Sequence, residues 1–531
     1  MKRAASSSVA AAAVIAAGLW LLWPRLHEQT VRADVLIVGA GVSGLSAAYE
    51  AGRGGASVAV ADMNSVFGGN AVMSEGGLFI VDTPLQRQLG VRDSTELAES
   101  DMLAWGEDSD AEQARAFVRA SRHEIWDWLT SLGVRFSAIR QQAGNHAPRF
   151  HENPERGLGV TRPIYRECLK YPNIRFYWST RIDRLTVEGG AVKGARGVNV
   201  RNGGAVRFEA RSIVLASGGF EGSEKLVREH WPAGAPQPER ILLGSSPNSA
   251  GAALRMGADV GAATHRLDHQ WRYPFGVPDP RFPGENRAVS VRNLNALWIN
   301  ASGRRFVNEW ASSRYTVEAV EKQQPATYWL VFDSKGVADL RYSGVDWADP
   351  AVARRLLVDN SSVTQQGATW TELARNAGLP ADRLEATVAR YNRMVADGED
   401  ADFHRFGKQA VEPWLMVFTP PAPRALDAPP FYAMQAYSMT RKSMGGLRVD
   451  LACHVLDAAA KPIPGLFAVG EASGLGGVNG KAGLEGTFLG PSIVQGRRVG
   501  RQLANDYGHG AIQPAPPQPA PWNQQRGSLA C

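Results

Sequence analysis

The chain has 531 residues, which is too long for one compact core and indicates two or three domains of unequal size. Its hydrophobic fraction of 44% and charged fraction of 21% are typical of a folded globular protein and exclude extensive disorder. The net charge of +6 is spread along the chain without a Lys- and Arg-rich run, so nucleic acid is not expected as a partner.

Residues 1–32 differ from the rest of the chain. Residues 4–23 carry no charge, and residues 9–23 are apolar throughout. A helix that spans a bilayer needs about 20 such residues, whereas the apolar part of a cleaved signal peptide needs roughly 7–15. Because Trp20 and Trp23 lie close to Arg25, as at a membrane interface, we expect a single uncleaved anchor rather than export after cleavage. The flanking basic residues do not decide on which side of the membrane the remainder lies.

The first strand, the turn after it and the next helix form a recognisable unit. Residues 35–38 are apolar and β-branched, as in a strand buried on both faces, and residues 45–49 are typical of a helix. Between them lie three glycines in the spacing G-x-G-x-x-G: Gly39, Gly41 and Gly44. The glycines permit a tight turn and let the backbone approach a pyrophosphate, whose charge the helix N-terminus stabilises.

An acidic residue completes this unit. Asp62 follows a second apolar strand, residues 57–61, and is placed to accept hydrogen bonds from a ribose. The sequence therefore predicts a Rossmann-like α/β domain that binds a dinucleotide.

Further glycine pairs favour a flavin over a nicotinamide. Two Gly-Gly loops follow Asp62 closely, and they suit backbone packing against a large planar ring. Two later strands end in a Gly-Gly and in a Gly-Glu turn. The residues of these four turns are Gly68, Gly69 and Asn70, then Gly76 and Gly77, then Gly218 and Gly219, then Gly470 and Glu471.

In this order, the four turns resemble those of the fumarate reductase and 3-ketosteroid Δ1-dehydrogenase superfamily of flavoproteins. Residues 77–84, 440–447 and 484–490 are most similar to the set called FAD-binding dehydrogenases, and the resemblance covers about residues 33–505. It implies FAD as the cofactor, with Glu471 on its ribityl chain and with Ser492 and Ile493, in a following helix, near the pyrimidine edge. No His occurs between Gly69 and Gly77, so noncovalent FAD is expected.

The resemblance also implies a fold class and a division of the chain. A discontinuous Rossmann-like FAD-binding domain would carry an inserted α+β capping domain. The expected segments are the N-terminal anchor or signal 1–32, the first FAD-binding part 33–264, the capping domain 265–428, the second FAD-binding part 429–508 and a Pro- and Gln-rich tail 509–531. Within the capping domain, residues 370–395 follow a helical period, with an apolar stripe that predicts core packing: Leu373, Leu384, Val388 and Tyr391.

Fumarate reductases imply one set of catalytic residues. Their proton-donating Arg would correspond to Arg314. Their carboxylate clamp is incomplete here, because residues 441–443 read Arg-Lys-Ser where they carry a His, and residues 481–483 offer no Arg. Ketosteroid dehydrogenases use tyrosines instead, and Tyr437, Tyr273 and Tyr315 are available, although none lies in a matching motif.

Arg441 and Lys442 are the leading site candidates, since they precede a Gly-Gly turn that leads back towards the flavin. Alternatively, they are a solvated pair at the end of a strand. His151 is a candidate proton relay or an ordinary hydrogen-bonded His, and Glu485 is either a base or a support for its glycine-rich loop. The three cysteines, Cys168, Cys453 and Cys531, are far apart, and no metal site is expected.

The sequence therefore predicts an FAD-dependent dehydrogenase that acts on a CH–CH bond next to a carbonyl group. Its partners would be a small-molecule substrate and an unidentified electron acceptor or donor. A fumarate-reductase-like reductase of an unsaturated acid is the alternative. A flavin electron-transfer module without a small substrate is the third hypothesis, and it does not explain why so large a capping domain is present.

Overall fold

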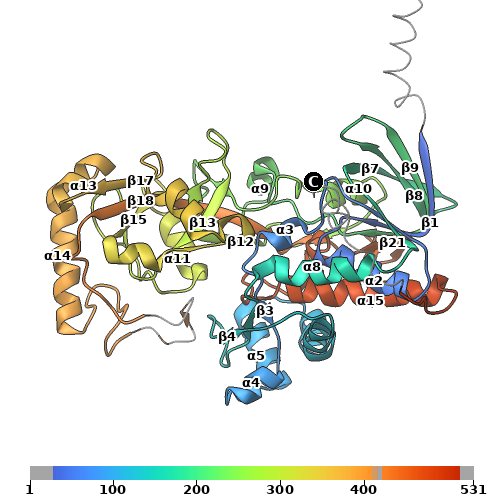
Figure 1. Cartoon of the computed structure of the whole chain (residues 1–531), viewed down its shortest axis with the longest axis horizontal. Helices are drawn as coiled ribbons and strands as arrows, with labels where there is room; N and C mark the ends of the chain where they lie inside the picture. The colour runs from blue at the N-terminus through green and yellow to red at the C-terminus, as the bar shows by residue number, and fades with distance from the viewer. Residues whose placement is uncertain (1–27, 411, 413–414, 417–420, 515–531) are drawn as a thin grey trace, which may run out of the picture.

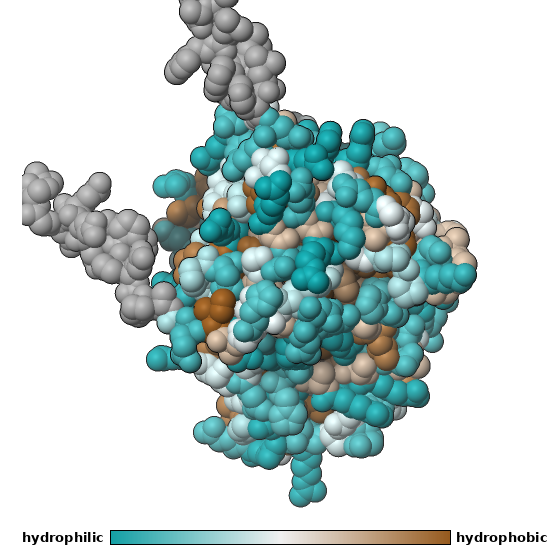
Figure 2. All heavy atoms as spheres, turned by 90° about the vertical axis from the view of Figure 1, so that its right-hand side faces the viewer, coloured by the Kyte–Doolittle hydropathy of each residue, from teal (hydrophilic) through white to brown (hydrophobic). Residues whose placement is uncertain are grey.

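The computed structural model describes residues 28–514, except residues 411, 413–414 and 417–420. Two large sheets lie at opposite ends of the elongated molecule, the first on the right and the second on the left in Figure 1. The face at the end of the first sheet is mainly hydrophilic, with small and separate hydrophobic patches (Figure 2). The α/β fold class predicted from the sequence is confirmed.

The first sheet has eight strands in the order β20-β21-β9-β1-β2-β6, and β8 joins β9 to β7. The pairings of β1 with β2 and β9, of β2 with β6 and of β21 with β9 are parallel. Residues 35–38 of β1 are buried, as the apolar run predicted. The strands are β1 Gln29–Val38, β2 Val58–Ala61, β6 Ile174–Tyr177, β7 Thr180–Glu188, β8 Ala191–Asn199, β9 Ala205–Leu215, β20 His454–Leu456 and β21 Pro462–Ala468.

Two helices from opposite ends of the chain lie side by side under this sheet: α2 (Val42–Arg53) and α15 (Leu489–Tyr507) (Figure 1). Their backbones approach closely. A Cβ atom on Gly496 would lie 2.2 Å from the carbonyl oxygen of Ser43, and one on Gly500 would lie 2.5 Å from that of Ala47. These glycines therefore allow the two halves of the discontinuous sequence to pack as one unit.

The second sheet also has eight strands, in the order β14-β15-β18-β12-β13-β16, with β10 and β17 paired to β18. Its long central strand β18 leads towards the first sheet and ends at Ser443. The strands are β10 Leu242–Leu243, β12 Gln270–Pro278, β13 Ala288–Arg292, β14 Leu297–Ile299, β15 Thr327–Phe332, β16 Arg341–Tyr342, β17 Thr364–Gly367 and β18 Phe431–Ser443. The helices packed around them are α11 Ser313–Glu321, α12 Pro350–Ala353, α13 Trp370–Ala377 and α14 Ala381–Asp397.

The predicted helical stripe of residues 370–395 is divided between two helices. α13 ends at Gly378, whose φ of +67° is left-handed, and Pro380 precedes α14. The stripe itself is core as expected, because each of its four members is no more than 1% exposed: Leu373, Leu384, Val388 and Tyr391. The residue boundaries that the sequence suggested for the FAD-binding and capping parts stay a prediction.

The remaining elements connect the two sheets and cover their junction (Figure 1). A three-stranded sheet has the order β3-β5-β4. The elements are α3 Gly69–Val72, β3 Leu78–Phe79, α4 Pro84–Gln88, α5 Thr95–Gly106, α6 Ala111–Ser121, the π-helix Arg122–Asp127, α7 Trp128–Ser131, β4 Ala138–Arg140, β5 Phe150–Glu152, α8 Arg156–Cys168, α9 Glu224–Glu229, α10 Ala252–Ala258, β11 Thr264–His265 and β19 Gly446–Leu447.

The predicted membrane-anchored localisation is corrected. In the part of the chain that the structure describes, no helix is both long and apolar enough to cross a bilayer. The segment on which the prediction depended, residues 4–23, lies outside the described residues.

A buried ion-pair cluster fixes the loop before β5. The guanidinium of Arg149 is fully buried and donates to the carboxylates of Asp93, at 2.7 Å, and Asp101, at 2.6 Å. A third donor bond reaches Asn145 at 3.1 Å. Since every partner is buried, the cluster is stable only as a complete set.

We expect Arg149→Leu to lower the free energy of unfolding by about 3–5 kcal/mol, because two carboxylates would stay buried without their cation. Chemical denaturation followed by far-UV circular dichroism measures the change. Arg354→Ala, which removes an exposed ion pair with Asp359, is the control and should cost less than about 1 kcal/mol. Equal effects of the two substitutions would contradict the assigned role of Arg149.

Candidate active site

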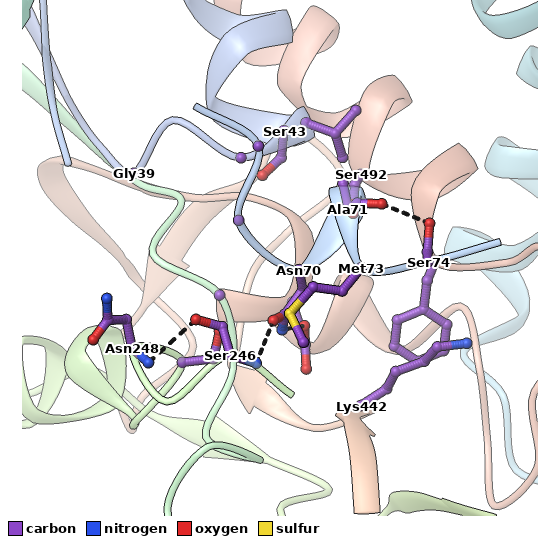
Figure 3. A pocket seen from close by; sticks show the side chains of 18 of the residues that line it. Gly39, Ser43, Asn70, Ala71, Met73, Ser74, Ser246, Asn248, Lys442 and Ser492 are labelled. Carbon is purple, nitrogen blue, oxygen red and sulfur yellow. Dashed lines mark hydrogen bonds between the residues drawn. The ribbon is translucent and has the colours of Figure 1, made fainter. Parts of the chain in front are cut away.

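One long cavity runs from the carboxyl ends of the first sheet to the end of β18; we call it the inner cavity. Asp62 and Asn64 lie at one end, and Tyr273, Arg292 and Lys442 lie at the other. Figure 3 shows Ser43 and Ser492 on one side, Asn70, Ser246 and Asn248 below them, and Lys442 apart from both groups. The residues that line the inner cavity come from α2, α3, α15, β12, β13, β18 and the turns after β1, β2 and β9.

The Asp62 end is built around one fixed carboxylate. Asp62 accepts hydrogen bonds from the backbone N–H groups of Ala40 and Asn64, both at 2.7 Å. Burial raises the pKa of Asp62, although these two hydrogen bonds oppose the rise. The carboxylate is thus oriented at the edge of the inner cavity, where a ribose hydroxyl could donate to it.

The glycine turn has one position that demands glycine and one that opens into the inner cavity. Gly39 has a φ of +113°, and a Cβ atom there would lie 2.3 Å from the carbonyl oxygen of Ala216. Gly41 is different, because a Cβ atom there would meet nothing within 4 Å. The absent side chain of Gly41 therefore leaves room beside the N-terminus of α2 for a ligand.

A hydrogen-bonded network crosses the middle of the inner cavity. The Asn70 side chain accepts from the backbone N–H of Ser246 at 2.8 Å and donates to the Ser245 hydroxyl at 2.7 Å. Glu471 accepts from the backbone N–H of Ser443 at 2.9 Å and from Asn70 at 3.4 Å. The network joins α3, the end of β18 and the Gly-Glu turn after β21, so Glu471 is fixed against the cavity wall.

At the far end, three polar side chains form a chain of contacts. The Lys442 ammonium donates to the Tyr273 hydroxyl at 3.0 Å, and that hydroxyl donates to the two Glu485 oxygens at 3.3 and 3.5 Å. Aromatic rings surround the ammonium, with its nitrogen 4.5 Å from the centroid of Trp271 and 4.6 Å from that of Phe488. The cation is therefore held by cation–π contacts with few polar partners.

Burial changes the proton affinities at this end. It lowers the pKa of Lys442 to about 8, although Glu485 opposes the change. Burial and the neighbouring Glu485 carboxylate raise the pKa of Tyr273 well above its usual value of 10. At neutral pH the site thus presents an ammonium group and a neutral phenol.

Two arginines add positive charge to the same end. Arg441 donates to the backbone oxygen of Met73, and burial lowers its pKa. Arg292 is paired with Glu75, which also accepts from the Ser343 hydroxyl at 3.0 Å. Burial lowers the pKa of Arg292 to about 10, so it too is charged at neutral pH.

The structure brings together most residues that the sequence singled out. Three of the six predicted catalytic residues line the inner cavity: Arg441, Lys442 and Glu485. The predicted cofactor residues that line it are Gly39, Gly41, Asp62, Gly68, Gly69, Asn70, Gly76, Gly77, Gly218, Glu471 and Ser492.

Four predicted cofactor residues support the lining instead of belonging to it. A Cβ atom on Gly44 would lie 2.0 Å from the Gly39 oxygen, and one on Gly219 would lie 1.9 Å from the Ser443 hydroxyl. Gly470 has a φ of +67° and faces Ser43, while Ile493 is fully buried.

His151, Arg314 and Tyr437 are not brought to the inner cavity. His151 is fully buried and meets the stacked rings of Trp126 and Phe136 edge-on. It is hydrogen-bonded to the Thr83 hydroxyl and the Arg149 carbonyl, both at 2.8 Å. Burial lowers its pKa to about 4, so it does not exchange protons near neutrality.

Arg314 and Tyr437 lie elsewhere for different reasons. Arg314 contributes to a second cavity, which we call the outer pocket, and pairs there with Glu107. Tyr437 lies in β18 opposite Gly276 and Thr327, with the Arg240 guanidinium 4.8 Å from its ring centroid. It is five residues before Lys442 and so precedes the part of β18 that reaches the cavity.

Sequence reasoning missed several lining residues. Tyr273 was noted without a motif, and Glu75 only as the residue before a Gly-Gly pair. Arg292, Ser246 and Asn248 were not noticed. A strand that begins with alternating Trp271 and Tyr273 was a usable signal, because residues i and i+2 lie on one face of a strand. The others lie in loops or pair across long sequence separations, which no local pattern reveals.

The residues fit the FAD that the resemblance implied. The Ser217 hydroxyl is buried beside the inner cavity and has no hydrogen-bond partner among the described residues, which is expected of a group that faces a ligand. The space at Gly41 and the oriented Asp62 suit a pyrophosphate and a ribose. An extended dinucleotide with its ribose at Asp62 would place its ring near Lys442.

Comparison with known proteins agrees with this fit. Residues 34–489 match the family model described as FAD binding domain. A KsdD-like steroid dehydrogenase of Mycobacterium tuberculosis is 30% identical, over 90% of this chain and 97% of the relative. A fumarate reductase (cytochrome) of Shewanella frigidimarina is 28% identical, over 89% of this chain and 77% of the relative.

Solved structures show the same fold. The open conformation of a flavocytochrome c3 fumarate reductase matches with a TM-score of 0.72 and 25% identity, over 89% of this chain and 78% of that one. The 3-ketosteroid delta1-dehydrogenase from Sterolibacterium denitrificans matches with a TM-score of 0.73 and 22% identity, over 90% of this chain and all of that one.

We expect Gly41→Val to lower the FAD content of the purified protein at least tenfold without unfolding it. Gly41 has extended backbone angles that valine adopts, and the new side chain would enter the inner cavity. The ratio of flavin to protein absorbance measures the change, and circular dichroism checks the fold. Ala351→Val, on an exposed residue of α12, is the control and should keep full FAD content. Normal FAD content in Gly41→Val would contradict this assignment.

Proposed function

Since the chain belongs to the FAD binding domain family and is an FAD-dependent oxidoreductase, we propose that it removes two hydrogens from a CH–CH bond next to a ring carbonyl, as in a steroid ketone. The observation that supports this most directly is the Lys442–Tyr273–Glu485 chain beside the Arg441 guanidinium. It offers a proton route and a positive group for a carbonyl oxygen in one place.

The glycine turn, Asp62 and Glu471 would hold FAD, which would supply the hydride acceptor for the second carbon of the bond. Tyr273 takes the proton from the carbon next to the carbonyl and passes its own proton along the hydrogen bond to Glu485. The raised pKa of Tyr273 keeps the phenol neutral, so it acts as a relay rather than as a phenolate base. Arg441 and Lys442 stabilise the negative charge that develops on the carbonyl oxygen.

The same residues argue against a dicarboxylate substrate. Arg292 is already paired with Glu75, and the Glu485 carboxylate lies among the remaining positive groups. A substrate with two carboxylates would meet too few unpaired cations and one repelling anion. A neutral ketone has one oxygen to be stabilised and otherwise contacts aromatic side chains. The electron acceptor that reoxidises the enzyme is a separate partner.

The test is anaerobic mixing of the FAD-loaded enzyme with a panel of saturated ring ketones, ketosteroids included, while the flavin absorbance is recorded. Bleaching by a ketosteroid, with formation of the conjugated product, is the expected result. If no ketone bleaches the flavin, and fumarate or another unsaturated acid reoxidises the dithionite-reduced enzyme, then the reductase function replaces this proposal.

We expect Tyr273→Phe to lower kcat at least a hundredfold with little change in KM, since it removes the proton relay and leaves the ring. FAD content should be unchanged, and rapid-reaction measurement of flavin reduction tests the step directly. Tyr177→Phe, at a half-buried tyrosine of β6 that lines neither the inner cavity nor the outer pocket, is the matched control. Reduction by Tyr273→Phe at the normal rate would exclude Tyr273 from the proton route.

We expect kcat/KM to fall as the pH rises through about 8, because Lys442 then loses the proton that gives it charge. Below that pH the ammonium is present and supports both Tyr273 and the carbonyl oxygen. In Lys442→Met this step of the pH profile should vanish and the activity should be low throughout. Lys461→Met, at an exposed position, should keep the step. A step that persists in Lys442→Met belongs to another group.

A further inference from the structure

The outer pocket adjoins the inner cavity, and Glu485 lines both. It has a volume of about 530 Å³, large enough for several rings. Its walls come from α5, the loop between β4 and β5, the start of β12, α11 and the glycine-rich loop before α15. The outer pocket therefore lies next to the place where a substrate would meet Tyr273 and Lys442.

An aromatic wall runs from one cavity into the other. Tyr273, in the inner cavity, stacks on Trp271, in the outer pocket, with 5.7 Å between ring centroids and 12° between ring planes. Farther out, Trp105 and Tyr315 meet edge to face at 6.3 Å. Flat aromatic surfaces along this path suit a rigid, flat and apolar fused-ring skeleton.

The charged groups of the outer pocket are already neutralised. Each of its basic side chains has a carboxylate partner: Arg272 with Glu321, Arg314 with Glu107, Lys322 with Glu318 and Lys481 with Glu107. The pocket therefore offers little to an anionic substituent at the far end of a substrate.

Two uncharged amide side chains of the outer pocket, unlike its charged groups, have polar atoms without a hydrogen-bond partner among the described residues. Gln142 is 1% exposed, and neither its side-chain oxygen nor its nitrogen has a hydrogen-bond partner among the described residues. Gln270 donates to the carbonyl oxygens of Val227 and His230 at 2.9 and 2.7 Å, which leaves its own buried oxygen without a donor. Buried amides cost free energy unless something bonds to them, so they point to a ligand with a complementary neutral group.

On the basis of the proposed function, we infer that the outer pocket holds the far end of an elongated fused-ring ketone and that Gln142 recognises a ketone or hydroxyl oxygen there. The amide of Gln142 donates to such an oxygen. Gln270 accepts in addition when the substituent is a hydroxyl. Gln142 is thus a specificity-determining residue at the opposite end of the substrate from the reacting bond.

The test compares two ligands that differ only at the far end: 4-androstene-3,17-dione and its analogue without the 17-oxygen. Perturbation of the flavin spectrum gives the dissociation constant of each with the FAD-loaded enzyme, so binding is measured whether or not turnover occurs. In Gln142→Met the diketone should bind about tenfold more weakly, and the analogue should bind within twofold of the unmodified enzyme.

Stability separates recognition from a structural role. Because the Gln142 amide has no partner among the described residues, its replacement by Met should not lower the melting temperature. Gln365→Met, in β17 of the second sheet, is the matched control and should change neither dissociation constant.

Equal weakening of both ligands, or no change in either, would overturn the assignment of Gln142. A selective effect on the diketone in an enzyme that catalyses no dehydrogenation would uphold the pocket and refute the proposed reaction. Failure of the unmodified enzyme to bind either ligand would refute both.

Discussion

The site depends on the hydrogen bonds that fasten the end of β18 to the first sheet. The backbone N–H and the hydroxyl of Ser443 both donate to Glu471, at 2.9 and 3.2 Å, and Glu471 belongs to the turn after β21. This contact places the two preceding residues, Arg441 and Lys442, over the inner cavity. β18, the central strand of the second sheet, is thereby fixed in position relative to the cofactor-binding turns of the first sheet.

Burial gives these residues their chemistry and also limits it. Desolvation lowers the pKa of Lys442 and raises those of Tyr273 and Glu471. The Glu485 carboxylate limits the shift of Lys442, and hydrogen bonds from Ser443 and Asn70 limit that of Glu471. The structure therefore concentrates ionisable groups without leaving large unbalanced charge. A phenol between an ammonium and a carboxylate is an arrangement that can move a proton in either direction, which is consistent with a family that contains both dehydrogenases and reductases.

The cofactor side of the site was largely predictable from the sequence, and the substrate side was not. Gly39, Asp62 and Glu471 lie at strand ends, where backbone geometry restricts the residue type, so a short pattern identifies them. Arg292 and Glu75 are 217 positions apart and pair only because the end of β13 meets the loop between α3 and β3. His151 was a misleading candidate, because the sequence alone does not distinguish a buried His with a structural role from a His that relays protons. The break between α13 and α14 was visible as Gly378 and Pro380 but was outweighed by a continuous apolar period.

The division of the site between two sheets has an evolutionary consequence. Tyr273 and Arg292 come from β12 and β13, whereas the glycine turn and Asp62 come from the first sheet. Mutations in the second sheet can therefore accumulate and change what is oxidised or reduced, while selection on cofactor binding acts on a different set of positions. A lineage with this architecture can acquire new substrates by drift on one side of the cavity alone.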